Sequence, residues 1–237
     1  MSSIRMVRLA VLSVLLTGCL AAIEILLPRL AHKEDFAQQG QKALEMKEYS
    51  RAIAAFTKAI QINPQDAASY SDRACAYAVK KQYDKALSDL NEAIRLEPKN
   101  TLTYCQRGNV YLKGKKYTKA ISDLSESIRL DGRQDDAYLN RGAAYASLGE
   151  YEKSLADLNE AIKLQPKDAV AYSERGYVYL CKNEYVKAVS DLTEAIRLDG
   201  KRDAAYRNRA YAYYMLGEHR KAFADLNEGH SPRSGRH

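Results

Sequence analysis

Apolar residues recur along most of the chain with the period of an amphipathic α-helix. Between residues 67 and 100, Tyr70, Ala74 and Tyr77 are spaced so that they share one helix face. After a short polar break, the apolar positions from Tyr83 to Leu96 outline a second amphipathic helix. This segment therefore predicts two antiparallel helices joined by a short turn.

The helix pair is repeated along the chain. The stretch DLNEAIRLEP, which begins at Asp89, returns in related form 34 residues later at Asp123 and again at Asp157 and Asp191. Because one helix pair cannot bury its apolar face alone, repetition at this period predicts a stack of pairs. The predicted units are 33–66, 67–100, 101–134, 135–168, 169–202 and a truncated 203–228.

Each unit ends at a residue that stops a helix. Pro98 prevents the second helix of its unit from continuing, and Asn100 can cap the first helix of the next unit. In two other units Gly132 and Gly200 stand in place of the proline. There we expect a C-terminal glycine cap.

Aromatic, small and large apolar positions recur in register. We expect the small residues to let two helices approach closely and the large apolar residue of each second helix to fill the core. The tyrosine series are Tyr70, Tyr104, Tyr138, Tyr172, Tyr206; Tyr77, Tyr111, Tyr145, Tyr179, Tyr213; and Tyr49, Tyr83, Tyr117, Tyr151, Tyr185. The small residues of the first helices are Gly40, Ala74, Gly108, Gly142, Gly176 and Ala210, and the core residues are Phe56, Leu90, Leu124, Leu158, Leu192 and Leu226.

This order of positions resembles the tetratricopeptide repeat, or TPR. The resemblance runs from Lys33 to about Glu228 and rests on the 34-residue period together with the order of aromatic and small positions. It implies an all-α, right-handed superhelical solenoid of about five and a half to six repeats. In such an array the first helices line a concave groove that usually holds a peptide.

An arginine and an aspartate also recur in every unit. A charge that every unit repeats serves a need common to all units, so we expect ion pairs that join helices rather than a site for an anion. The residues are Arg73, Arg107, Arg141, Arg175 and Arg209, with Asp89, Asp123, Asp157, Asp191 and Asp225.

The net charge of +7 changes this picture little. Six of the 37 basic residues and one of the 30 acidic residues lie outside residues 34–228, which leaves that segment with a net charge of only +2. The basic excess sits at the two ends of the chain, so we expect no nucleic-acid binding by the repeats.

Residues 1–31 predict an export signal or a membrane anchor. Arg5 and Arg8 precede an uncharged apolar run to Ile23. Within it, LTGC ending at Cys19 resembles the bacterial lipobox, which implies lipidation of Cys19. An uncleaved helical anchor, a conventionally cleaved signal and a chance apolar helix are the alternatives. With a signal or an anchor, the repeats lie outside the cytoplasm in the cell envelope.

Positions that vary between units are the candidates for binding. Some TPR proteins grip a chaperone's C-terminal carboxylate with two asparagines and three basic residues. Asn109 and Asn140 fall at the asparagine places, but the basic places hold Cys105, Val170 and Glu174. Without those cations the carboxylate has no partner, so we reject this clamp. The two asparagines could still bond the backbone of a ligand.

A second candidate is aromatic. Tyr177, Tyr211 and Tyr214 are the three tyrosines outside the recurring series, and they cluster on groove positions of the last two units. Rigid aromatic side chains with a polar tip are favoured at binding surfaces. We expect a peptide site that also includes Leu180, Arg207 and Met215. The alternative is that these residues begin a surface covered by a longer array.

No motif for catalysis, metal or cofactor binding occurs.

The second helix of the sixth unit is cut short, and the polar residues 229–237 predict a disordered tail. This uncapped end could associate with itself or with a partner. We therefore expect a membrane-tethered, non-enzymatic adaptor for a protein or peptide. The alternative is an accessory or truncated relative of a larger TPR-containing enzyme.

Overall fold

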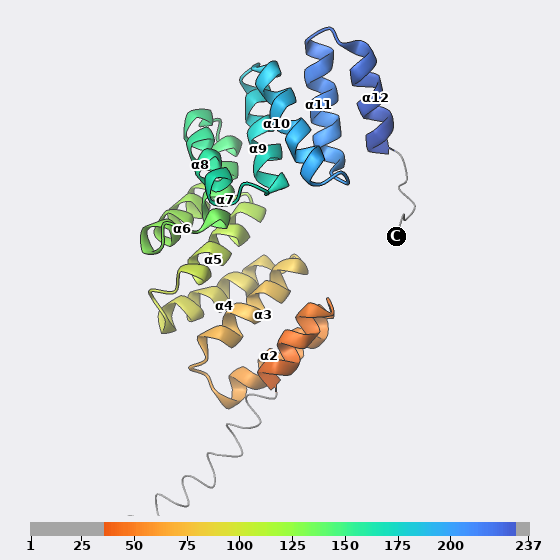
Figure 1. Cartoon of the computed structure of the whole chain (residues 1–237). Coiled ribbons are helices and arrows are strands. Elements are labelled where there is room, and N and C mark those ends of the chain that lie inside the picture. Colours follow the sequence, from red (N-terminus) through yellow and green to blue (C-terminus); the bar gives the residue numbers. More distant parts are fainter. Residues whose placement is uncertain (1–35, 231–237) are drawn as a thin grey trace, which may run out of the picture. The chain divides into compact units, whose positions relative to one another are not determined.

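The computed structural model describes residues 36–230. All regular structure in these residues is helical, as the sequence predicts. The chain divides into two compact units, Met1–Pro98 and Lys99–His237. Figure 1 labels the helices α2 to α12.

The described part of the first unit consists of four helices. Residues 36–45 are helical, followed by α2 (Tyr49–Ile62), α3 (Ala67–Val79) and α4 (Tyr83–Leu96). Helix α3 packs against both α2 and α4. Ala76 of α3 joins Phe56 and Ala52 of α2 in one buried cluster, so the second helix of one pair packs on the first helix of the next.

The described part of the second unit contains four helix pairs. Consecutive helices pack against each other from α5 to α12, and α5, α7, α9 and α11 also contact one another in that order. The first helices therefore form a layer of their own. The bounds are α5 (Thr101–Lys113), α6 (Tyr117–Leu130), α7 (Asp135–Ser147), α8 (Tyr151–Leu164), α9 (Ala169–Cys181), α10 (Tyr185–Leu198), α11 (Asp203–Met215) and α12 (His219–His230). Helix α12 includes the first two residues of the segment predicted as a tail.

The turn inside each pair is closed by a left-handed residue. Between α9 and α10, Asn183 has φ 61°. Its N–H donates to the Leu180 carbonyl at 2.9 Å, and the Glu184 N–H donates to the Tyr179 carbonyl at 2.8 Å. These two bonds satisfy carbonyls at the end of the helix. The equivalent left-handed residues are Lys47, Lys81, Lys115, Gly149 and Gly217.

The prediction of glycine caps at Gly132 and Gly200 is wrong. The glycines with a positive φ, Gly149 and Gly217, lie in the turns inside pairs. Gly132 and Gly200 do not have a positive φ. Helix α6 ends instead at extended Asp131, whose Oδ1 accepts from the Arg133 N–H at 3.0 Å. The aspartate side chain thus stabilises the turn locally, so no left-handed residue is needed. The Asn100 cap is confirmed, since its Oδ1 accepts from the Thr103 N–H at 3.2 Å.

Small residues hold the two helices of a pair close together, as predicted. A Cβ at Gly176 would lie 2.7 Å from Cγ of Leu192, and one at Gly142 would lie 2.9 Å from Cγ of Leu158. Both leucines are fully buried. Each leucine of a second helix therefore occupies the space that the missing side chain of the first helix leaves.

The recurring arginines and aspartates form the predicted ion pairs. Arg141 on α7 donates through Nε and Nη2 to the carboxylate of Asp157 on α8, both at 2.8 Å. Its Nη1 donates to Ser125 Oγ on α6 at 3.0 Å, which adds a bond to the preceding pair. The hydrogen bonds to Asp157 raise the pKa of Arg141. The same bidentate pair joins Arg73–Asp89, Arg107–Asp123, Arg175–Asp191 and Arg209–Asp225.

We predict that Leu158→Ala lowers the free energy of unfolding by about 2–5 kcal/mol, because it removes a fully buried side chain and leaves a cavity. The matched control is Leu102→Ala on α5, where the leucine is 58% exposed. It should cost about 1 kcal/mol or less. Chemical denaturation measures both values, and equal losses would contradict the burial difference.

We also predict that Arg141→Ala costs about 3–5 kcal/mol, because it leaves the buried carboxylate of Asp157 without its cation. The control is Arg129→Ala, which breaks an exposed pair with Glu126 and should cost about 1 kcal/mol or less. Thermal unfolding of both variants checks the difference. A loss no larger for Arg141→Ala than for Arg129→Ala would show that the repeated pair does not stabilise the fold.

Candidate functional site

Two exposed tyrosines lie on neighbouring first helices of the second unit. Tyr177 on α9 is 46% exposed and Tyr211 on α11 is 51% exposed, and these two helices contact each other. The Tyr211 and Tyr185 rings form a T-shaped pair, with centroids 6.5 Å apart and an interplanar angle of 76°. This contact holds one side of Tyr211 while the rest of the side chain stays accessible.

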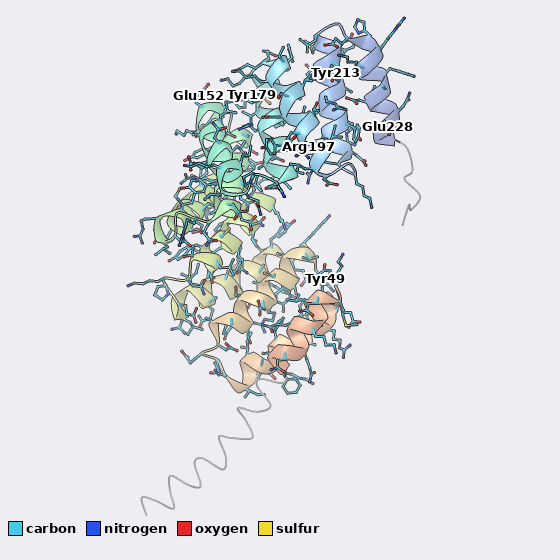
Figure 2. All side chains as sticks on the ribbon, in the orientation of Figure 1. Tyr49, Glu152, Tyr179, Arg197, Tyr213 and Glu228 are labelled. Carbon is cyan, nitrogen blue, oxygen red and sulfur yellow. The ribbon has the colours of Figure 1, made fainter. Side chains whose placement is uncertain are left out.

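The tyrosines of the recurring series are used differently. Lys187 Nζ lies 5.4 Å from the centroid of the Tyr179 ring, while Arg209 and Lys221 lie 5.8 and 5.2 Å from that of Tyr213. Figure 2 labels Tyr179 and Tyr213 among the side chains of the last helices. Cations from the same helix pair thus cover these rings. These rings are engaged within the fold, which leaves Tyr177, Tyr211 and Tyr214 as the candidates for binding.

Cys181 lies one turn after Tyr177 on α9. The influence of its side chain is the main cause of the raised pKa of Tyr177. Cys181 also interacts with Tyr151 of α8 and raises its pKa. A raised pKa keeps the phenol of Tyr177 neutral at physiological pH, so that it can donate as well as accept a hydrogen bond.

A carboxylate lies one turn before Tyr177. Burial raises the pKa of Glu174, and the charge of Arg202 acts in the opposite direction. Arg202 itself has a buried Nε without a hydrogen-bond partner in the described residues, 3.8 Å from Asp199 Oδ2. Since Glu174 also influences the pKa of Tyr177, an acidic group and an aromatic ring share this part of α9.

The two asparagines are less available than the tyrosines. Asn109 on α5 and Asn140 on α7 are both partly buried. Burial is the main cause that raises the pKa of the Cys105 thiol to about 12, and Asn140 acts in the opposite direction. Cys105 is therefore a protonated, unreactive thiol at neutral pH. Bonding of both asparagines to a ligand stays a prediction.

Leu180 does not belong to an exposed surface. It is 8% exposed and lies in a core cluster with Leu192 and Ala212, because the α11–α12 pair covers it. Tyr214 occupies the equivalent position one pair later and is 61% exposed, with its ring 5.3 Å from that of His219. Arg207 and Met215 are also exposed. Tyr214 thus lies on the side where a further pair would pack.

The structure shows exposed apolar residues on α12 that the sequence analysis did not predict. Leu226 is not a core residue as predicted, and Phe223, which the sequence did not single out, is 67% exposed. Both positions are apolar in the preceding units, so the repeat pattern predicts that they belong to the core. The repeat pattern contains no signal that separates them from their buried equivalents, because their exposure depends on the packing of α12, which contacts only α11 among the described helices.

Several sequence predictions concern residues 1–31, including lipidation of Cys19, and these lie outside the described residues. Within residues 36–230, no helix combines the length and apolar composition needed to cross a bilayer. The same residues contain no group of three or more His, Cys, Asp or Glu side chains placed to hold a metal ion.

Comparison with family models identifies the repeat. Models described as TPR repeat or tetratricopeptide repeat match residues 37–66, 55–88, 76–114, 108–149 and 142–182. Together they extend from residue 37 to residue 182, more than half of the chain. The protein therefore belongs to the tetratricopeptide-repeat family. No curated protein matches the sequence significantly.

Solved structures support the same fold. PilW, described as a widely conserved type IV pilus biogenesis factor, has a TM-score of 0.78 at 17% identity and covers 85% of this chain and 94% of its own. PilF of Pseudomonas aeruginosa has a TM-score of 0.75 at 16% identity, with coverage of 87% and 95%. YrrB, described as a TPR protein with an unusual peptide-binding site, has a TM-score of 0.58 at 24% identity, with coverage of 74% and 90%.

Proposed function

We propose that this protein is a membrane-tethered adaptor that binds a peptide segment of another protein on the first-helix layer of residues 99–230. The observation that carries the proposal is the exposure of Tyr177 and Tyr211 on the adjacent helices α9 and α11. Both rings are fixed on helices rather than on loops. Rigid aromatic side chains contribute contact area at a small cost in conformational entropy.

The groups around the two tyrosines favour an amphipathic segment with a basic residue. Glu174 lies beside Tyr177 and is partly withdrawn from water, so a cation of the ligand would offset the cost of keeping its carboxylate charged. Arg207, one turn before Tyr211 on α11, is exposed and offers a donor for a carbonyl or carboxylate of the same segment. The tyrosine rings would contact its apolar side chains.

The comparisons lend this proposal general support. YrrB is described as having a peptide-binding site, which shows that a chain of this fold can bind a peptide. At 24% identity the likeness extends to the fold alone, so the choice of residues in this protein rests on their exposure and chemistry.

To test the peptide site, peptides would be selected from a random library on the wild-type protein and their affinities measured by fluorescence anisotropy. We predict that Tyr177→Ala and Tyr211→Ala each weaken binding about tenfold or more, as expected for central aromatic anchors. Val186→Ala is the matched control, because Val186 is an exposed apolar residue on the second helix α10. Peptides that bind both tyrosine variants as tightly as the wild type would refute the site.

We further propose that residues 1–31 tether the protein to a membrane of the cell envelope, with lipidation at Cys19 as the first possibility and an uncleaved helical anchor as the second. Intact mass of the native protein from fractionated cells distinguishes them. We expect a membrane fraction containing a lipid-modified chain that begins at Cys19. An unprocessed chain in membranes would mean an anchor, and an unprocessed chain in the soluble fraction would overturn the tether.

A further inference from the structure

Among the described helices, only α11 packs against α12, and this leaves an exposed apolar surface that is the counterpart of a buried core. We define the end face as Tyr214, His219, Phe223 and Leu226. One pair earlier, the equivalent residues are Leu180, Tyr185, Val189 and Leu192. Those four belong to or pack against one core cluster, which Ala205 and Ala212 of α11 complete.

The leucine shared by the two sets shows the effect of the neighbouring helix. Leu192 is fully buried because α11 packs on it, whereas Leu226 at the equivalent position is 42% exposed. Phe223 is larger than the valine at its equivalent position and is more exposed still. Large exposed apolar residues on one helix are candidates for an interaction site. The end face thus stands at the repeat positions where the preceding pair meets its neighbour.

A polar acceptor at the edge of the end face also lacks the donor that its equivalents have. In the earlier second helices, this position accepts a hydrogen bond from the arginine of the following pair, as Asn159 does from Arg175 at 2.7 Å and Thr193 from Arg209 at 3.0 Å. The equivalent residue of α12 is Asn227, which is exposed. No arginine of a following pair reaches it among the described residues. The end face therefore suits a partner that brings an arginine to this edge.

A second copy stacked head to tail does not fit this surface. In such a stack, the first helix of the second copy would present Lys42 to the end face. The equivalent residues of the later first helices are all buried and small or β-branched: Ala76, Val110, Ala144, Val178 and Ala212. Lys42 is exposed. Placing its ammonium group in an apolar interface without a partner would be costly, so an open-ended stack is disfavoured.

The chain's own C-terminal residues are also a poor match. In the sequence of residues 231–237, every residue except Pro232 and Gly235 has a polar or charged side chain. Such a segment offers little apolar area to cover Phe223 and Leu226. The occupant has to supply apolar side chains together with an arginine.

A second α12 helix in antiparallel orientation supplies both. Arg220 and Asn227 are seven residues apart, so they lie on the same edge of α12, with Arg220 in its first turn and Asn227 in its last. Both are exposed. When a two-fold axis perpendicular to both helices relates two copies of α12, Arg220 of one copy lies opposite Asn227 of the other.

The helix dipoles favour the same orientation. Arg220 of one copy then approaches the C-terminal end of the other α12, where a cation is stabilised. A parallel pairing would instead bring each Arg220 toward the N-terminal end of the opposite helix, which carries a partial positive charge. The antiparallel pairing is therefore the one that the charges support.

We propose that two copies of this chain associate through their end faces, about a two-fold axis that sets the two α12 helices antiparallel. Phe223, Leu226 and Tyr214 of each copy bury the same residues of the other, and each Arg220 donates to Asn227 of the opposite copy. The interface is closed, so association ends at the dimer. Its apolar centre excludes Tyr177 and Tyr211, which stay available for peptide in both copies.

The test is sedimentation equilibrium of the full chain in a non-ionic detergent. We expect a dimer as the largest species, and Phe223→Glu should raise its dissociation constant about tenfold or more because it places a charge in the apolar centre. Val186→Glu, an equally exposed substitution on α10, should leave the constant unchanged. A wild-type chain that stays monomeric would overturn the proposal, and so would a dimer insensitive to Phe223→Glu.

Exchange of the edge residues tests the antiparallel geometry. Arg220→Glu alone should weaken the dimer because it removes the donor to Asn227. Asn227→Arg alone should weaken it by setting two cations together, and the double variant should restore it through a glutamate–arginine pair. Lack of rescue would refute the antiparallel arrangement.

Lys42 distinguishes the dimer from an open stack. Lys42→Ala should have no effect on the dimer, because the residue lies on a first helix far along the chain from α12. Species that grow beyond the dimer, and that Lys42→Ala strengthens, would show a head-to-tail stack and refute the two-fold pairing.

Discussion

Every helix pair in this protein depends on its neighbour to bury its apolar face. Leu192 is sealed by Ala205 and Ala212 of the next first helix, and it also occupies the space left by Gly176 within its own pair. One residue thus links packing inside a pair to packing between pairs. Because each pair faces the same requirement, the sequence repeats the same apolar, small and aromatic positions.

The repeated arginine–aspartate ion pairs make this apolar packing geometrically specific. Each arginine bonds the aspartate of its own pair. Arg73, Arg141, Arg175 and Arg209 also reach a polar side chain of the preceding pair through a third nitrogen. Hydrogen bonds have narrow geometry, so these bonds fix how one pair sits on the next. The repeated charges are therefore committed to structure, and function is left to positions that differ between units.

Two surfaces of unlike chemistry remain for binding. The first-helix layer carries Tyr177 and Tyr211 with charged groups beside them, which suits a segment that has both apolar and polar side chains. The end face, with Phe223 and Leu226, is mainly apolar and is bordered by Arg220 and Asn227, which suits a second copy of itself. A dimer built in this way would present two peptide sites, so a partner with two binding segments would gain from avidity.

The sequence by itself determined the helix pairs, their period, their register and the ion-pair ladder. These follow from spacing along the chain, because residues one helical turn apart share a face whatever surrounds them. The sequence also pointed to Tyr177 and Tyr211, since they lie outside the recurring tyrosine positions.

Only the tertiary structure decided which of these residues are buried. Leu180 and Tyr214 share one position in the repeat, as do Leu192 and Leu226, yet one member of each couple is covered and the other exposed. Burial depends on which groups arrive from elsewhere in space, and a pattern of spacing along the chain does not contain that information.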